Sequence, residues 1–93
     1  MILIREDGSS EVFEDARHLA LEALQAIVGG LIEVVAFRDG SAVIVNEEGL
    51  LLGLGHNPAA SIIAMSKGRG MRLVGPVAFL TAAEVRSMEA DDA

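Results

Sequence analysis

Polar side chains that could bind or react gather in one short stretch of the chain, between residues 46 and 58. Glu47 and Glu48 supply adjacent carboxylates, His56 supplies an imidazole and Asn57 an amide. A histidine beside carboxylates titrates near neutral pH and can serve as a general base or a metal ligand. That chemistry requires the loop to fold back on itself; in the alternative, Asn57 caps a helix and His56 faces solvent. The predicted binding residues are Asn46, Glu47, Glu48, Gly49, Gly53, His56 and Asn57.

A second group of charges lies further along the chain, where Lys67, Arg69 and Arg72 are interleaved with glycines. They form the one basic cluster of a chain whose formal net charge is −7. Three cations and flexible glycine amides can receive a phosphate or a carboxylate. In the alternative, this is a solvated loop whose cations lie near a helix C-terminus, where the helix dipole favours them.

Other chemistries find little support in the sequence. The run 53–58 opens like a dinucleotide-binding fingerprint, but Pro58 stands where the third glycine is required. His18 and Glu22 would share one helix face, yet two ligands do not make a metal site. The chain has no cysteine and no nucleophile-elbow motif, so thiol catalysis and zinc–thiolate clusters are excluded. We therefore expect no enzyme activity, no metal and no cofactor.

Length and charge limit the class of protein. Ninety-three residues, 52% of them apolar, suit one domain with a modest core. The acidic charge repels phosphate backbones, and three phenylalanines without tryptophan or tyrosine give no base-stacking platform. Direct nucleic-acid binding is therefore not expected. The start of the chain lacks a signal-peptide pattern and the apolar runs are short, so we expect a cytoplasmic protein without membrane contact.

The elements that must position these groups are predicted from turn and cap residues. Asp-Gly at 7–8 and at 39–40 indicates two hairpin turns, and Gly-Gly at 29–30 indicates a helix end. Asn-Pro at 57–58 favours a helix start, and Thr and Glu at 81 and 84 form a capping box. The pattern predicts strands over 1–5, 11–13, 31–37, 41–46 and 71–80, a helix capped by Asp15, a helix over 59–66 and a last helix through about Met88.

This order of elements, β-β-α-β-β-α-β plus a C-terminal helix, predicts an α+β fold that is β-grasp-like (ubiquitin-like), with the last strand central and beside the first. We expect one domain over residues 1–88 and an acidic tail over 89–93. The pair Gly75 and Pro76 falls inside the last predicted strand, where proline cannot donate to a ladder, so a bulge or an unpaired side is required there.

The strand at 31–37 is apolar on both faces. Leu31, Val35 and Phe37 share one face, and Ile32, Val34 and Ala36 share the other. A sheet covered by a single helix should alternate apolar and polar residues, so something must cover the second face. The C-terminal helix, a second copy of the chain or another protein would each do so. We expect self-association, most simply as a dimer.

Several motifs of the chain resemble one protein family, across most of its length. The run from Leu24 to Val35, then Asn46-Glu47-Glu48-Gly49 and Gly53-Leu54-Gly55-His56-Asn57, is similar to domain of unknown function three-eight-four-six. Members typically read Gly-Leu-Pro where this chain has Gly53-Leu54-Gly55. The resemblance implies an accessory protein of phages, plasmids or conjugative elements and assigns no chemistry. The matching polar positions are Glu33, Asn46, Glu47, Glu48, Gly49, Gly53 and Asn57.

The function predicted from these observations is a non-catalytic interaction module that binds itself or another protein. Its working surface would be the loop 46–57 with the neighbouring apolar sheet face. The carboxylates would supply charge complementarity, and the leucines at 50, 51, 52 and 54 an apolar anchor. The alternative is a small-molecule binder, in which Lys67, Arg69 and Arg72 receive an anionic metabolite or a nucleotide-derived signal.

Overall fold

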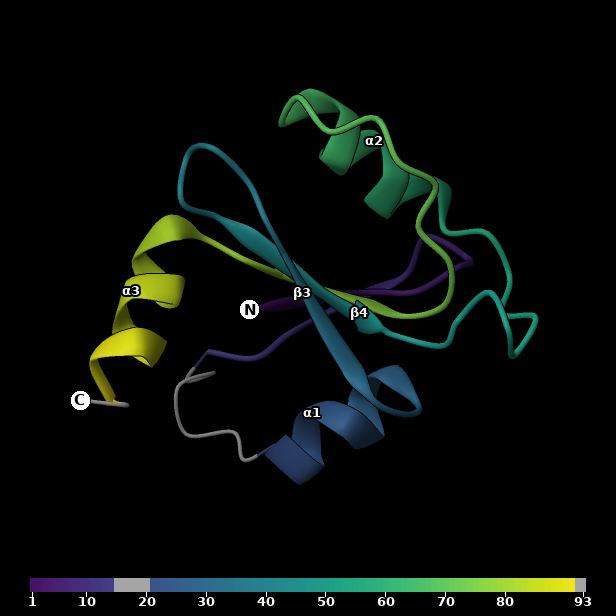
Figure 1. Cartoon of the computed structure of the whole chain (residues 1–93), viewed down its shortest axis with the longest axis horizontal. Coiled ribbons are helices and arrows are strands. Elements are labelled where there is room, and N and C mark those ends of the chain that lie inside the picture. Colours follow the sequence, from purple (N-terminus) through teal and green to yellow (C-terminus); the bar gives the residue numbers. More distant parts are fainter. Residues whose placement is uncertain (15–20, 92–93) are drawn as a thin grey trace.

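The computed structural model describes residues 1–14 and 21–91. In chain order the elements are β1 Ile2–Ile4, β2 Ser10–Val12, α1 Leu21–Val28, β3 Ile32–Ala36, β4 Ala42–Asn46, α2 Pro58–Ser66, β5 Val77–Leu80 and α3 Ala82–Asp91. The predicted cap at Asp15 and His18, which was considered with Glu22 and not predicted to bind a metal, lie outside the described residues. The α+β class is confirmed, as a small domain with one five-stranded sheet (Figure 1).

The sheet is antiparallel throughout, with the strand order β2-β1-β5-β4-β3. As predicted, β5 is central and lies beside β1. The β-grasp arrangement is not confirmed, because β1 and β5 are antiparallel here, whereas the first and last strands of a β-grasp sheet are parallel. The chain leaves the sheet after β4, passes through α2 and returns at the same end, since Ala42 pairs with Leu80 and Ile44 with Ala78. This excursion makes β5 the antiparallel neighbour of β4.

Helices of the same chain cover both faces of the sheet (Figure 1). On one face, α2 packs its alanines, Ala60 and Ala64, against the strands. On the other face, α1 contributes Leu24 and Val28, and α3 adds the partly buried Val85. The first core contains Val35, Phe37, Val43, Val45, Leu73 and Val77; the second contains Met1, Ile44, Ala78 and Leu80. The central strands are therefore covered from both sides, but in β3 and the residue after it only Val35 and Phe37 are buried, whereas Val34 and Ala36 on the opposite face are exposed. The expected second copy on that face stays a prediction.

The last strand is shorter than predicted, because it begins at Val77 instead of residue 71. Gly75 has a φ of +72°, a left-handed conformation that interrupts an extended strand, and Pro76 follows it. Of the four residues before them, Leu73 is buried in the first core with the α2 alanines, and Met71 packs against that core. Val74 forms a single bridge with His56. Residues 71–74 therefore line the α2 side of the molecule, where they form part of the candidate site.

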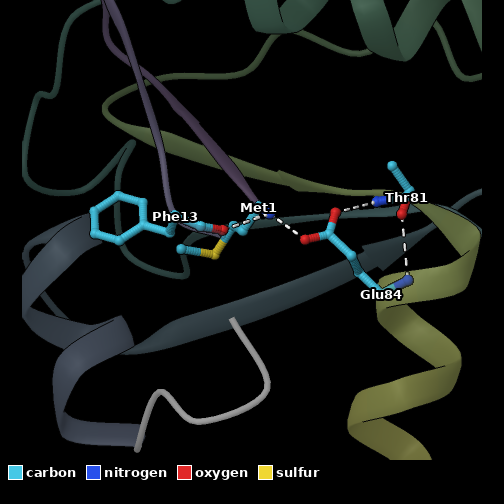
Figure 2. Close-up of polar contacts among 4 residues, drawn as sticks. All are labelled: Met1, Phe13, Thr81 and Glu84. Carbon is cyan, nitrogen blue, oxygen red and sulfur yellow. Dashed lines mark hydrogen bonds and ion pairs between the residues drawn. The ribbon is translucent and has the colours of Figure 1, made fainter. Parts of the chain in front are cut away.

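The predicted capping box at the start of α3 is present (Figure 2). The Thr81 amide donates to Glu84 Oε1 at 3.0 Å, and the Glu84 amide donates to Thr81 Oγ1 at 3.2 Å. The other carboxylate oxygen of Glu84 pairs with the buried Met1 amine, which also donates to Phe13 O at 3.1 Å. α3 then runs to Asp91, beyond the predicted end at Met88. Glu84 thus ties the third helix to the first strand.

These contacts set the charge state of Glu84. Burial by itself raises the pKa of the carboxyl, but hydrogen bonds from the Met1 amine and the Thr81 amide outweigh it. The net effect is a pKa below the ordinary value of a glutamate. The ionised form therefore stabilises the folded chain.

Candidate functional site

The loop after β4 is anchored by Asn46, which is buried at the strand end. Its side-chain amide donates to Val28 O at 3.2 Å, and its oxygen accepts from the Glu48 amide at 2.8 Å. A Cβ on Gly30 would lie 2.9 Å from the Asn46 amide nitrogen, so the helix end and the asparagine fit closely. Asn46 therefore fixes the direction in which the loop leaves the sheet, and it also lines the groove beside the loop.

Residues 48–54 form a compact turn, which we call the leucine turn. The Leu52 amide donates to Glu48 O at 2.9 Å, and the Leu54 amide donates to Gly49 O at 3.0 Å. The base of the turn faces inward, because Gly49 is buried and a Cβ there would lie 2.8 Å from Val74 Cγ2. Its internal bonds hold the backbone in one conformation without help from a ligand.

The leucine turn displays apolar side chains to solvent. Leu50 is 78% exposed, Leu51 85% and Leu52 58%. Leu54, the fourth member of the predicted anchor, instead faces inward, where it lies 2.6 Å from the position of a Cβ on Gly75. Three consecutive exposed leucines on an ordered turn are a concentrated apolar surface of the kind that marks interaction sites.

Asn57 is fully buried and holds three segments together. Its side-chain nitrogen donates to Ile4 O and to Gly75 O, both at 2.9 Å. Its side-chain oxygen accepts from the Ala60 amide at 3.1 Å, which caps α2 as predicted. Every polar atom of this side chain is therefore used inside the fold, and Asn57 is a structural residue at the base of the site.

A groove of about 400 Å³ lies between the leucine turn, the β3–β4 end and residues 71–74. We call it the first groove. Its walls are mainly apolar, from Val45, Met71 and Leu73, and its charged groups are Glu33, Glu47 and Arg72. Leu50 and Leu51 border it, so the exposed leucines and the groove form one continuous surface.

A second groove, of about 520 Å³, runs along the outer side of α2 and contains His56. Exposed Ile62 and Met65 line it, and Met71 and Arg72 separate it from the first groove. His56 Nε2 lies 3.3 Å from Ser61 Oγ. That hydroxyl donates to Asn57 O at 2.8 Å and accepts from the Leu73 amide at 2.9 Å, so its proton is committed to the helix backbone. The pair lacks the geometry of a nucleophile activated by a base.

The predicted basic cluster is divided between different partners. Lys67 Nζ pairs with Asp39 at 2.6 Å and lies 5.6 Å from the centre of the Phe79 ring. Hydrogen bonds from Lys67 and from Ser41 hold the pKa of Asp39 far below its ordinary range. Arg69 Nη1 donates to Ala36 O at 3.2 Å. Arg72 faces the grooves, so the structure gives separate roles to the three cations proposed to bind one anion.

The structure therefore separates the predicted site residues into two groups. Asn46, Gly49 and Asn57 support the backbone, while Glu47, Glu48, Gly53 and His56 are exposed. Glu47 lines the first groove and His56 lines the second. The carboxylate and the imidazole that were proposed to share one polar pocket therefore lie in different grooves. In the described residues, no group of three or more possible ligands stands close enough to hold a metal ion.

Sequence reasoning missed two residues at the grooves, Met71 and Ser61. Met71 lines both grooves, and Ser61 carries a hydrogen bond from the chain that passes over α2. The signal for Ser61 was its position within one helical turn after the Asn57 cap, where a hydroxyl can bond the cap carbonyl. Met71 gave no local signal, because its role depends on where β5 begins.

Comparison with known proteins shows the family of this chain. A family model described as Domain of unknown function (DUF3846) matches residues 1–91. The chain belongs to this family. No curated protein and no solved structure matches it. Family positions recognised from the sequence now acquire physical roles here: Asn46, Gly49 and Asn57 build the loop, and Glu33 and Glu47 line the first groove.

The helices carry no membrane signal: within residues 1–14 and 21–91, none is both long and apolar enough to span a bilayer. This finding concerns the described helices alone.

Proposed function

We propose that this protein is a non-catalytic interaction module that inserts its leucine turn into an apolar pocket of another protein. The observation that carries the proposal is the exposure of Leu50, Leu51 and Leu52 on a turn whose backbone is already hydrogen-bonded. Burying one leucine side chain contributes about 1.5–3 kcal/mol, so a turn with three of them is an effective anchor. Because the turn is preformed, little conformational entropy is lost when it binds.

The charges around the turn favour a partner with a basic rim. Glu47 and Glu48 are exposed beside the leucines, and the chain has a net charge of −7. Carboxylates at the edge of an apolar contact select partners with complementary charge and accelerate their association. The first groove can receive an apolar side chain from such a partner, next to Glu33 and Arg72.

The partner we favour is a host protein or a protein encoded by the same mobile element, inside the cytoplasm. This part of the proposal rests on the resemblance described above and on sequence composition. Small-anion binding is the less supported function, because Lys67 already pairs with Asp39 and Arg69 already donates to Ala36 O. The commitment of the Ser61 proton to Asn57 O likewise supports a non-catalytic role.

Site-specific photo-crosslinking in cells of the natural host tests this proposal. A crosslinking amino acid at position 51 should capture a discrete protein, and the same group at position 21 serves as the matched control, since Leu21 is exposed on α1. Changing Glu47 and Glu48 together to lysine should abolish the adduct. Failure to capture a discrete adduct at position 51, or identical adducts from both positions, would refute the proposed surface.

With the captured partner purified, a binding titration gives the magnitude. Leu51→Asp should weaken binding about 10–100-fold, because it removes one buried leucine and introduces a charge. His56→Ala should leave the affinity within about threefold of the original protein, because His56 lies outside the first groove. An equal loss in both variants would show that the leucine turn is not the anchor.

A further inference from the structure

The free edge of the sheet at β3 presents a row of outward backbone groups. Within the described residues, β3 pairs with β4 alone. The Phe37 amide bonds Ser41 O at 2.8 Å and the Glu47 amide bonds Leu31 O at 2.8 Å. Hydrogen-bonded and non-hydrogen-bonded positions alternate along an antiparallel ladder. The odd-numbered residues of this segment therefore face β4, and Ile32, Val34 and Ala36 direct their amides and carbonyls outward.

This edge has few of the usual protections against pairing with another strand. Proteins blunt edges with proline, charged side chains, bulges or very short strands. β3 has five residues without a proline, Glu33 is its one charged residue, and Val34 at its centre is 59% exposed. In the described part of the chain, one outward group has a partner, since Ala36 O accepts from Arg69. The opposite edge, β2, has three residues, and its Glu11 pairs with Arg5 at 2.7 Å.

We propose that β3 pairs antiparallel with β3 of a second copy, about a two-fold axis at Val34. In this register Val34 meets its own counterpart and Ile32 meets Ala36 of the second copy. Each residue that directs its backbone groups outward then finds a residue that does the same. The two exposed valines become a cross-strand pair, which stabilises a sheet. A two-fold interface uses the same patch on both copies, as this register requires.

The charges at the two ends of the edge are complementary under the same two-fold axis. Glu33 lies on the sheet face covered by α2, the same face as Val35, and Arg69 follows α2. The proposed register places Glu33 of the second copy opposite Val35, next to the Ala36 carbonyl that binds Arg69. An acidic end of one strand thus meets a basic end of the other, and symmetry forms this contact twice. Glu33 aside, the interface shares no residue with the leucine turn or the first groove, so it stands independently of the proposed function.

The expected association is weak, because two short strand edges bury less surface than the roughly 1,000 Å² of a stable interface. Sedimentation equilibrium from about 10 μM to about 1 mM covers this range of affinity. The average mass should rise from the 9.7 kDa of one chain toward twice that value. Amide hydrogen exchange at Ile32 and Val34 should slow as the concentration increases, because their outward amides become bonded. A single-chain mass throughout, or exchange that does not depend on concentration, would overturn the proposal.

Exposed valines on the two edge strands provide a matched pair of variants. Val34→Lys should abolish dimerisation, whereas Val12→Lys, at a valine 64% exposed on β2, should leave it unchanged. Glu33→Arg and Arg69→Glu should each weaken the dimer about tenfold, and their combination should restore it. A dimer that persists in Val34→Lys but is lost in Leu51→Asp would overturn β3 pairing in favour of the leucine turn. Circular dichroism of each variant confirms that the fold is intact.

Discussion

Removing the side chain of Asn57 should damage the fold more than any exposed substitution in the loop. The amide nitrogen donates to Ile4 O and Gly75 O, and the oxygen caps α2 through the Ala60 amide. Loss of a cap costs about 1 kcal/mol. Each buried carbonyl left without a donor costs about 1–3 kcal/mol. With partial relaxation, Asn57→Ala should lower the free energy of unfolding by about 3–5 kcal/mol, which is a large part of the roughly 5–15 kcal/mol of a small domain.

Two further variants at the same position separate the cap from the donors. Asn57→Ser retains a cap acceptor and should be more stable than Asn57→Ala. Asn57→Asp also retains the acceptor, but it has no donor and directs a buried charge at two carbonyl oxygens. At neutral pH it should therefore be at least as damaging as alanine. Burial raises the pKa of such a carboxyl, so the protonated aspartate should recover part of the loss as the pH falls.

Urea denaturation followed by circular dichroism measures these differences. An unchanged dependence of the free energy of unfolding on urea concentration shows that the variants unfold to the same state. Ser66→Ala is the matched control, because its exposed hydroxyl bonds Ile63 O inside the same helix at 2.7 Å. That variant should change stability by about 0.5 kcal/mol or less. A loss of less than about 1 kcal/mol in the free energy of unfolding for Asn57→Ala would refute the role of Asn57 in holding three segments together. So would an Asn57→Asp variant as stable as the original protein at neutral pH.

Two smaller predictions concern charge and backbone conformation. The pKa of Glu84 is lowered in the folded chain, so its ionised carboxylate stabilises the fold above the ordinary glutamate pKa. This stabilisation is lost as the pH falls through the folded-state pKa. Glu84→Gln keeps the capping geometry, so thermal melts should show about 1 kcal/mol or less of destabilisation at pH 7 and none near pH 3; a constant difference would contradict this. Gly53 has a φ of +68°, so Gly53→Ala should cost about 1–2 kcal/mol in urea denaturation. Gly55 is not left-handed, and a Cβ there meets nothing nearer than 3.8 Å, so Gly55→Ala should raise the free energy of unfolding by about 0.4–1 kcal/mol. Similar effects at both glycines would contradict the difference between their backbone conformations.

The elements that could be predicted from the sequence depend on residues close together in the chain. The α2 cap by Asn57 and the capping box of Thr81 and Glu84 are confirmed, because a cap bonds amides two or three residues away. The Asp39-Gly40 hairpin was likewise predicted correctly. Family membership also followed from the sequence, since its motifs lie in the right order along the chain.

Errors arose where distant segments decide the outcome. The last strand was predicted to begin at residue 71, but the left-handed Gly75 ends one segment and Val77 begins another. The doubly apolar strand at 31–37 indicated a cover on each face, but α2 covers Val35 and Phe37 while Val34 and Ala36 stay exposed on the other face. A hydrophobic pattern indicates that a face is apolar, but it does not indicate which element covers that face.

The sequence by itself therefore determined the order of strands and helices, their caps and hairpin turns, the acidic charge, and the loop in which the polar groups gather. Tertiary structure alone decided what those groups do. Asn57 is separated from Ile4 by 53 positions, and their hydrogen bond exists because the sheet and α2 meet there. The same packing turns Leu54 inward and leaves Leu50, Leu51 and Leu52 in solvent; among the described residues it also leaves one edge of β3 unpaired. Local preferences act over one or two turns of chain, whereas the surface available to a partner is what remains after the whole core has been packed.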